Sequence, residues 1–178
     1  TIDLSGTGND LSGAVTLTGA AVTLQDTTAT AITGITATGD LSVTSGGAIT
    51  QTGAIDADLA SSFTAGANAI TLTNASNDFS GAVSLSNSGT NDVALTDANA
   101  LDLGTVDAGQ NLTITTSGAI SDSGVVTVAG TTTFDNSGGS SAAILLDSES
   151  TYTGNVSFTT DAGSDVTITD NSAFAIQS

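Results

Sequence analysis

One eight-residue phrase occurs three times in this chain. DLSGAVTL at residues 10–17 returns as DFSGAVSL at 78–85 and as TYTGNVSF at 151–158, so the second interval is slightly longer than the first. Sequence units that recur at a long, nearly constant period stack on their own copies in repeat proteins. The phrase therefore predicts an elongated rod, and it constrains shape far more than it constrains any ligand.

Matches continue between the phrases. VTLQD at 22–26 corresponds to VALTD at 93–97 and VTITD at 166–170, and residues 41–53 correspond to 112–124. The interval varies only slightly from match to match, and such variation fits insertions in loops between fixed strands. We expect a single domain over residues 1–178, made of about two and a half degenerate long repeats and forming a window of a longer array.

Apolar residues alternate with polar ones in short bursts between Gly, Asn, Asp and Ser. This period of two predicts short β-strands with the apolar side chains inward and Thr16, Thr23, Thr71, Thr113 and Thr167 outward. Regular strand spacing also fits a sandwich or barrel, but the long repeat favours an all-β solenoid of stacked coils with little or no α-helix. Coils of about 20–25 residues would give about seven to nine coils. The apolar pairs include Ile2/Leu4, Val15/Leu17, Val22/Leu24, Leu41/Val43, Ile70/Leu72, Val83/Leu85, Val93/Leu95, Leu101/Leu103, Leu112/Ile114, Val126/Val128, Ile144/Leu146, Val156/Phe158, Val166/Ile168 and Phe174/Ile176.

Composition supports a stacked β-structure over a disordered chain. The net charge of −18 and the six aromatic residues favour disorder, whereas the mean hydropathy of +0.24 and the regular apolar pairs oppose it. Proline, which cannot donate to a β-ladder, is absent, as is cysteine. Stability must therefore come from stacking between neighbouring coils.

Two stretches, GDLSVTSGGAITQTG at 39–53 and ITLTNASNDFSGAV at 70–83, resemble the repeats of giant bacterial surface proteins. These are the filamentous-haemagglutinin-like and related β-strand-repeat adhesins. The resemblance implies a right-handed parallel β-helix, export to the cell surface, and a role in adhesion, aggregation or extracellular filaments. It implies no catalytic or binding residue, because the similarity lies in the scaffold.

The residue types present exclude several kinds of chemistry. Without His, Cys, Lys or Arg the chain has no Ser–His or Cys–His nucleophile, no Schiff base, no imidazole or thiolate metal site and no basic nucleic-acid surface. Asp56 and Asp58 are the nearest local pair of carboxylates for a polysaccharide-cleaving β-helix enzyme. The alternative is a solvated turn before Leu59, and we predict no catalytic residue and no enzyme.

Calcium is the one cofactor that the composition leaves open. Asp and Asn oxygens in turns are suitable ligands, and the candidates are Asp56 with Asp58 and the Asn91–Asp92 turn with Asp97. Gly46–Gly47 and Gly138–Gly139 lack the Gly and Asp that would complete the signature of calcium-loaded β-rolls. The equivalent residues Asp26, Asp97 and Asp170 would lie roughly 14–19 Å apart at three or four coils per repeat. We therefore predict no metal site, and interpret the carboxylates as dispersed surface charge.

Ice binding, glycan binding and glycosylation remain as further alternatives. Thr-x-Thr pairs start at Thr16, Thr71, Thr113 and Thr167, but the intervals between them are too long and uneven for one pair per coil. A glycan groove would need exposed rings, whereas all six aromatic residues occupy inward positions of the pattern. The sequons at Asn74, Asn111 and Asn155 are expected by chance in a chain so rich in Ser and Thr.

The sequence thus predicts a structural segment of a secreted or cell-surface bacterial fibre or adhesin, acting as a stiff acidic scaffold. Expected partners are other copies of the chain, end to end or side by side, and a host or neighbouring cell surface. We expect no nucleic-acid partner and no membrane span in this segment, since no apolar run is long enough. A glycan- or calcium-binding extracellular module is the alternative.

Overall fold

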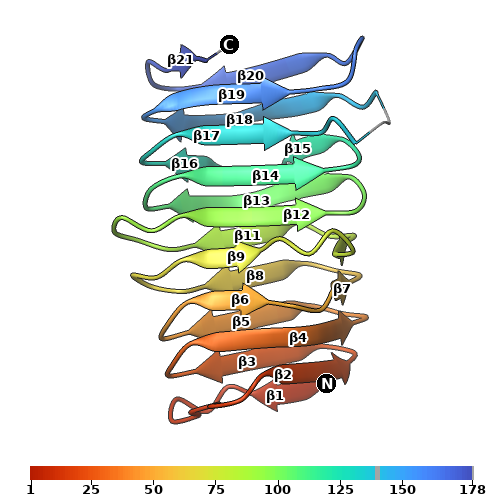
Figure 1. Cartoon of the computed structure of the whole chain (residues 1–178), viewed down its shortest axis with the longest axis vertical. Coiled ribbons are helices and arrows are strands. Elements are labelled where there is room, and N and C mark those ends of the chain that lie inside the picture. Colours follow the sequence, from red (N-terminus) through yellow and green to blue (C-terminus); the bar gives the residue numbers. More distant parts are fainter. Residues whose placement is uncertain (139–140, 178) are drawn as a thin grey trace.

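The computed structural model describes residues 1–138 and 141–177, which form a parallel β-solenoid of about nine turns and no helix. In Figure 1 the strands of one sheet run to the right in front, those of the other run to the left behind, and the chain rises from its N-terminus to its C-terminus. The winding is therefore right-handed. The predicted all-β, right-handed parallel β-helix is confirmed.

Two sheets form the long sides of every turn. Sheet A contains β1 (Ile2–Leu4), β3 (Val22–Asp26), β5 (Leu41–Ser45), β8 (Ser61–Thr64), β11 (Val83–Ser86), β13 (Leu101–Ala108), β15 (Ile120–Asp122), β16 (Val126–Val128), β18 (Ile144–Tyr152) and β20 (Val166–Asp170). Sheet B contains β2 (Val15–Gly19), β4 (Thr30–Ala37), β6 (Ile49–Gln51), β7 (Ile55–Ala57), β9 (Ile70–Leu72), β10 (Asp78–Phe79), β12 (Val93–Asp97), β14 (Leu112–Thr116), β17 (Thr132–Asp135), β19 (Asn155–Thr159) and β21 (Ala175–Ile176).

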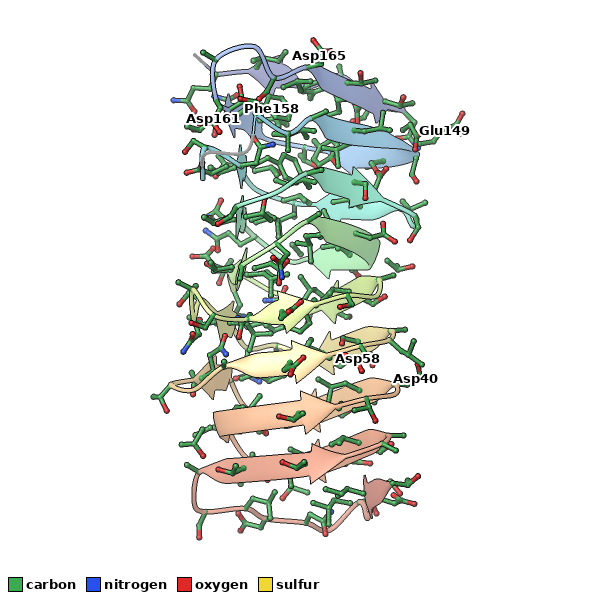
Figure 2. All side chains as sticks on the ribbon, turned by 90° about the vertical axis from the view of Figure 1, so that its right-hand side faces the viewer. Asp40, Asp58, Glu149, Phe158, Asp161 and Asp165 are labelled. Carbon is green, nitrogen blue, oxygen red and sulfur yellow. The ribbon has the colours of Figure 1, made fainter. Side chains whose placement is uncertain are left out.

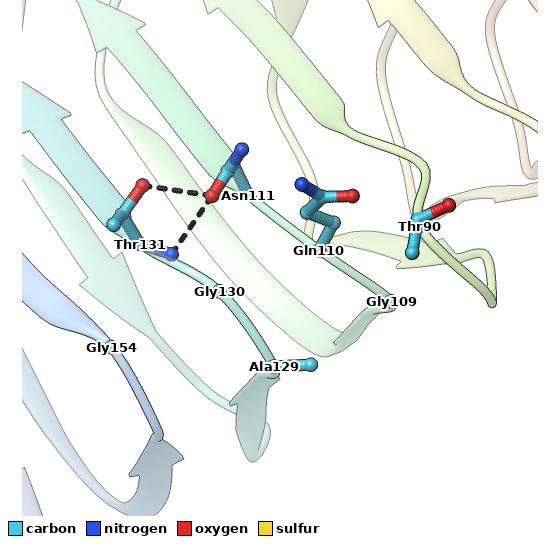
Figure 3. Close-up of a pocket in the computed structure, with 8 residues that line it drawn as sticks. All are labelled: Thr90, Gly109, Gln110, Asn111, Ala129, Gly130, Thr131 and Gly154. Atoms are coloured by element: carbon cyan, nitrogen blue, oxygen red, sulfur yellow. Dashed lines mark hydrogen bonds between the residues drawn. The ribbon is translucent and has the colours of Figure 1, made fainter.

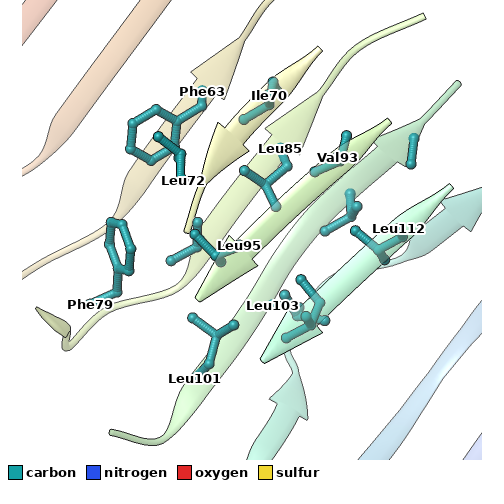
Figure 4. Packing of buried hydrophobic residues seen from close by; sticks show 14 of the residues in the cluster. Phe63, Ile70, Leu72, Phe79, Leu85, Val93, Leu95, Leu101, Leu103 and Leu112 are labelled. Carbon is teal, nitrogen blue, oxygen red and sulfur yellow. The ribbon is translucent and has the colours of Figure 1, made fainter. Parts of the chain in front are cut away.

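The alternating sequence pattern places one continuous core between the sheets. Strand residues alternate between buried and exposed positions, as in β14, where Leu112 and Ile114 are buried and Thr113 is exposed. The same inward side chains line up from turn to turn (Figure 4). Val166 of β20 and Ile176 of β21 pair in register with the buried residues Ile144 and Val156, but 40% and 67% of their surface is exposed in the last turn.

Aromatic side chains pack inside the core, as the sequence predicts. Phe63 packs edge to face on Phe79, with ring centroids 6.0 Å apart. Phe134 stacks on Phe158 at 5.7 Å and meets Tyr152 edge to face at 6.2 Å. These contacts link successive turns across the interior, so the rings serve packing and do not form a binding surface.

The glycine of the recurring phrase allows close packing of neighbouring turns at one corner. A methyl group on Gly81 would lie 2.5 Å from the carbonyl oxygen of Leu59 in the adjacent turn. Gly154, at the equivalent position of the third copy, would meet the carbonyl of Gly130. At these two corners a side chain would force the turns apart.

The long repeat spans three and a half turns, so equivalent strands lie on opposite sheets. Three steps within sheet A lead from β3 through β5 and β8 to β11, and β12 follows half a turn later in sheet B. The same path leads from β12 through β14, β17 and β19 to β20 in sheet A. The repeat thus lies between the three and four coils expected from the sequence, and its half turn is what places equivalent strands on opposite sheets. A strand with one apolar face fits either sheet, so the sequence pattern alone does not distinguish them.

Replacing Phe134 with Ala should show how much the stacked core stabilises the rod. The change removes contacts to two neighbouring turns, and we expect the free energy of unfolding to fall by about 3–5 kcal/mol. Urea unfolding followed by far-ultraviolet circular dichroism measures the loss. Thr127→Ala, on the outer face of β16, is the control, and a loss no larger than the control's would contradict this account of the core.

Candidate functional site

Three buried or half-buried aspartates close equivalent corners in the three copies of the repeat, at the ends of β3 and β20 in sheet A and of β12 in sheet B. Asp97, the last residue of β12, is 1% exposed; its Oδ1 accepts a hydrogen bond from Phe79 N at 3.0 Å and its Oδ2 one from Asn99 N at 3.2 Å. Equivalent pairs of bonds reach Asp26 from Leu11 N and Thr28 N, and Asp170 from Tyr152 N and Ser172 N. Leu11, Phe79 and Tyr152 are the second residues of the three phrases. The phrase and the Asp-terminated strand are therefore two parts of one corner clamp.

The clamp corrects the interpretation of these carboxylates as dispersed surface charge. Burial raises the pKa of Asp97, the hydrogen bonds from Phe79 and Asn99 oppose that rise, and nearby Asp78 adds to it. At Asp26 burial also acts to raise the pKa, but hydrogen bonds from Leu11, Thr28 and Thr30 outweigh it, so that the pKa is lowered. These aspartates stabilise the join between turns, in which their oxygens accept main-chain hydrogen bonds.

A second buried corner differs between two copies of the repeat. In one copy the side chains of Gln51 and Asn77 bond to each other in both directions, at 2.8 and 2.9 Å, and Ile55 N donates to Asn77 Oδ1. In the next copy Asp122 and Ser150 take the places of the two amides, and Val126 N donates to the Ser150 hydroxyl.

The Asp122 corner is less completely paired than the amide corner. Asp122 Oδ1 accepts hydrogen bonds from Asp147 N and Ser148 N, whereas its buried Oδ2 and the buried Tyr152 hydroxyl have no hydrogen-bond partner within the described residues. Burial raises the pKa of Asp122, main-chain bonds from β18 oppose this, and the carboxylates of Asp147 and Asp102 add to the rise. An ionisable group thus stands in the core where the preceding repeat has a neutral pair.

The two sets of calcium candidates lie in different surroundings. Asp92 and Asp97 lie at opposite ends of β12, and Asp92 Oδ1 accepts hydrogen bonds from the main chain and side chain of Asn111. Asp56 lies on β7 opposite Asp78 of β10, whereas Asp58 follows the strand in an exposed bend. Within residues 1–138 and 141–177 no three acidic side chains come close enough to hold a metal ion.

Other carboxylates project from the rim of the turns. Figure 2 shows Asp40, Asp58 and Glu149 pointing outward at the corners, with Asp165 in an upper loop. The Gly46–Gly47 turn lies in a corner between β5 and β6, and Gly139 of the other Gly-Gly pair lies outside the described residues. The surface charge is thus spread along the rod at its corners.

One groove, with a volume of about 370 Å³, lies at the corner near β12, β14 and β17. Its lining contains Gly109, Gly130 and Gly154, together with Gln110 and the Asn111–Thr131 contact (Figure 3). Asn111 Oδ1 accepts hydrogen bonds from Thr131 N at 2.9 Å and from Thr131 Oγ1 at 2.8 Å. The lining residues carry no carboxylate and no ring, so this groove offers neither acid–base groups nor a stacking platform for a sugar.

The three sequons fall at different places on the turns. Asn74 donates through Nδ2 to Thr52 O, Asn111 is held by the bonds just described, and Asn155 begins β19 and is exposed.

The described residues contain no helix of the length and hydrophobicity that crossing a bilayer requires.

Threonine columns on sheet B were missed by counting Thr-x-Thr pairs along the sequence. The outward residues of β6, β9, β12, β14 and β17 align in register as Thr50, Thr71, Ala94, Thr113 and Thr133. The turns that carry Thr71 and Thr113 are separated by the single turn of Ala94, so the long interval between these two threonines is two turns of one face. Threonine thus occupies this position in four of the five turns from β6 to β17, a regularity that the spacing of the counted pairs did not reveal. A complete Thr-x-Thr pair in every turn is still absent, because Ala94 precedes Thr96 and Asp135 follows Thr133, and Thr167 lies on sheet A.

Comparison with known proteins identifies a repeat family. The family model described as repeats of unknown function (DUF5649) matches residues 19–86 and again residues 90–159. The second match begins one long repeat, or three and a half turns, after the first. No curated protein and no solved structure matches the chain.

Replacing Asp122 with Asn should test the ionisable corner. Because the folded state raises the pKa of Asp122 above its ordinary 3.8, this residue contributes stability below that value and loses it as pH rises through the folded pKa. We expect Asp122→Asn to unfold at higher urea than the parent at pH 7, with the difference shrinking as pH falls toward 3.8. Asp58→Asn, in an exposed bend, is the matched control. Lower stability of Asp122→Asn at pH 7 would show instead that the ionised carboxylate is favourable.

Proposed function

Since the chain belongs to the DUF5649 family of repeats, we propose that it is a structural segment of a secreted or cell-surface bacterial fibre or adhesin. The observation that carries the proposal is the continuous core and the parallel pairing of successive strands along about nine turns. Each turn bonds to the turns on either side through its main chain, so bending the rod would break many hydrogen bonds at once. The resemblance to filamentous-haemagglutinin-like repeats supports the same role.

The side chains of the described residues also favour a scaffold. The polar groups that are held in place, among them Asp97, Asn77 and Asn111, bond to the protein's own main chain or to other side chains. A catalytic site instead needs acids or bases directed into a cleft, and the groove near β14 is lined by neutral groups. The chain would act through reach and stiffness, and through contact with other copies or with a cell surface.

Electrostatic repulsion should control how these rods approach one another. A net charge of −18 without a single Lys or Arg keeps copies apart at low ionic strength, and divalent cations should reduce this repulsion.

Light scattering during a titration with NaCl and with CaCl₂, at matched ionic strength, tests the proposal. We expect the scattering mass to rise with salt, and to rise at lower ionic strength with calcium than with sodium. Electron microscopy of the associated samples should show laterally or axially joined rods. A chain that stays monomeric up to physiological ionic strength in both salts would contradict self-association as its mode of action.

A further inference from the structure

We infer that the outer face of sheet B binds ice through two columns of threonine. We call this surface the threonine face. Its first column is Thr50, Thr71, Ala94, Thr113 and Thr133, which pair in register. Its second contains the paired Thr96 and Thr115, together with Thr52 and Thr73, which directly follow the ends of β6 and β9. Each of the turns that carry β6, β9, β12 and β14 supplies two positions of the face, and β17 adds Thr133.

The main chain fixes the spacing of the threonine face. Pairing runs from β6 through β9, β12 and β14 to β17 without a register shift, in contrast to the interrupted pairing of β2 with β4 and of β18 with β20. Neighbouring strands therefore place equivalent side chains about 4.8 Å apart along the rod, and alternate residues of one strand about 6.7 Å apart across it. A rigid two-dimensional array of this kind can hold water oxygens in positions comparable with those of an ice surface.

The side chains of the face suit ordered water. Within the described residues, the hydroxyls of Thr50, Thr71 and Thr113 form no hydrogen bond to the protein, which leaves them available to water. Threonine is β-branched and stiff at χ1, so its methyl and hydroxyl groups keep fixed positions. Water bound between such groups gains hydrogen bonds at a small entropic cost to the protein.

The positions of this face carry no charge, although the chain has a net charge of −18. Asp92 precedes β12, and Asp135 of β17 pairs with Thr115, so the second column ends at β14. On sheet A, strands β13 and β18 carry Asp102, Asp107 and Asp147, whereas the outward residues of β3, β5, β8 and β11 are neutral as well. Ions orient water radially around themselves, so a neutral face is required for a lattice of water to form.

The internal repeat provides a comparison of the two sheets. Because equivalent strands lie on opposite sheets, each threonine of the first column has a sequence counterpart in sheet A. Thr113 corresponds to Ser42, Thr133 to Ser62, Thr50 to Ser121 and Thr71 to Leu145. In these four pairs threonine occupies the sheet B position, whereas at the fifth position of the column the order is reversed, because the counterparts of Ala94 are Thr23 and Thr167 on sheet A.

Other occupants fit the threonine face less well. A polysaccharide surface would favour exposed rings, and the aromatic side chains of this chain are directed into the core. A second copy would bring another net charge of −18 against this one, and the face offers methyl and hydroxyl groups but no large apolar side chain.

Thermal hysteresis and ice-recrystallisation assays of the purified chain in low-salt buffer test the inference. We expect the parent to separate the freezing and melting temperatures and to shape ice crystals. Thr113→Tyr places a bulky ring in the centre of the face and should abolish both effects. Thr127→Tyr is the matched control, because Thr127 is also an exposed threonine between two buried apolar residues but lies on sheet A, and it should keep both effects.

Circular dichroism should confirm that both variants remain folded, and Thr71→Tyr replaces Thr113→Tyr if the latter does not fold. A parent chain with no effect on ice would overturn the inference, as would an equal loss in the sheet A control. Sedimentation of the parent and of Thr113→Tyr identifies the remaining alternative. If the substitution on the threonine face disperses an oligomer and leaves ice growth unchanged, the face is an interface between copies and the inference fails.

Discussion

Main-chain pairing between successive turns is the constraint on which the rest of this molecule depends. Most strands lie between two parallel neighbours, so their N–H and C=O groups are bonded above and below, and their side chains alternate between core and solvent. A slip of one residue would expose an entire column of Val, Ile and Leu. Extra residues are accommodated at the corners, as in the turn from Thr132 to its partner Val156, which is longer than the turn from Val22 to its partner Leu41. They are also accommodated at local irregularities, such as the register shift between β11 and β13.

The corners are where the chain places its polar chemistry. Where the chain leaves a strand at a buried corner, its main-chain N–H groups lose their partners in the ladder. Burying such a group without a hydrogen bond costs folding free energy. Asp97 supplies two acceptor oxygens at such a corner, and Asn77 supplies both an acceptor and donors at another. Burying a carboxylate is tolerated where several donors surround it, as at Asp26, and it is least well compensated at Asp122. The same scaffold thus contains corners that respond differently to pH.

Much of the fold follows from the sequence, because period-two alternation decides which side chains face inward. Leu112, Ile114 and the rings of Phe63 and Phe134 lie where that pattern predicts. The alternation does not indicate how many residues each corner contains, however, and the lengths of the corners determine how many turns a repeat occupies. For that reason the half-turn offset, the clamp at Asp97 and the threonine columns were not predictable from local alternation. Asp97 follows Val93 and Leu95 at the same two-residue spacing, which indicates a buried position at the end of the strand. Its charge, however, favoured the interpretation that it lies at the surface.

A repeat of three and a half turns has a consequence for how such a rod acquires different faces. If the copies were identical, the half-turn offset would place the same outward residues on both sheets, and the two outer faces would be chemically alike. A distinct face arises only when consecutive copies diverge at outward positions while their inward positions stay apolar. Leu41 and Leu112 are equivalent inward residues that are the same in both copies. Ser42 and Thr113, which follow them, are equivalent outward residues that differ. Divergence between copies that stack in one core is therefore the route by which this solenoid places different outward residues on its two sheets, without any change in the ladder that holds both.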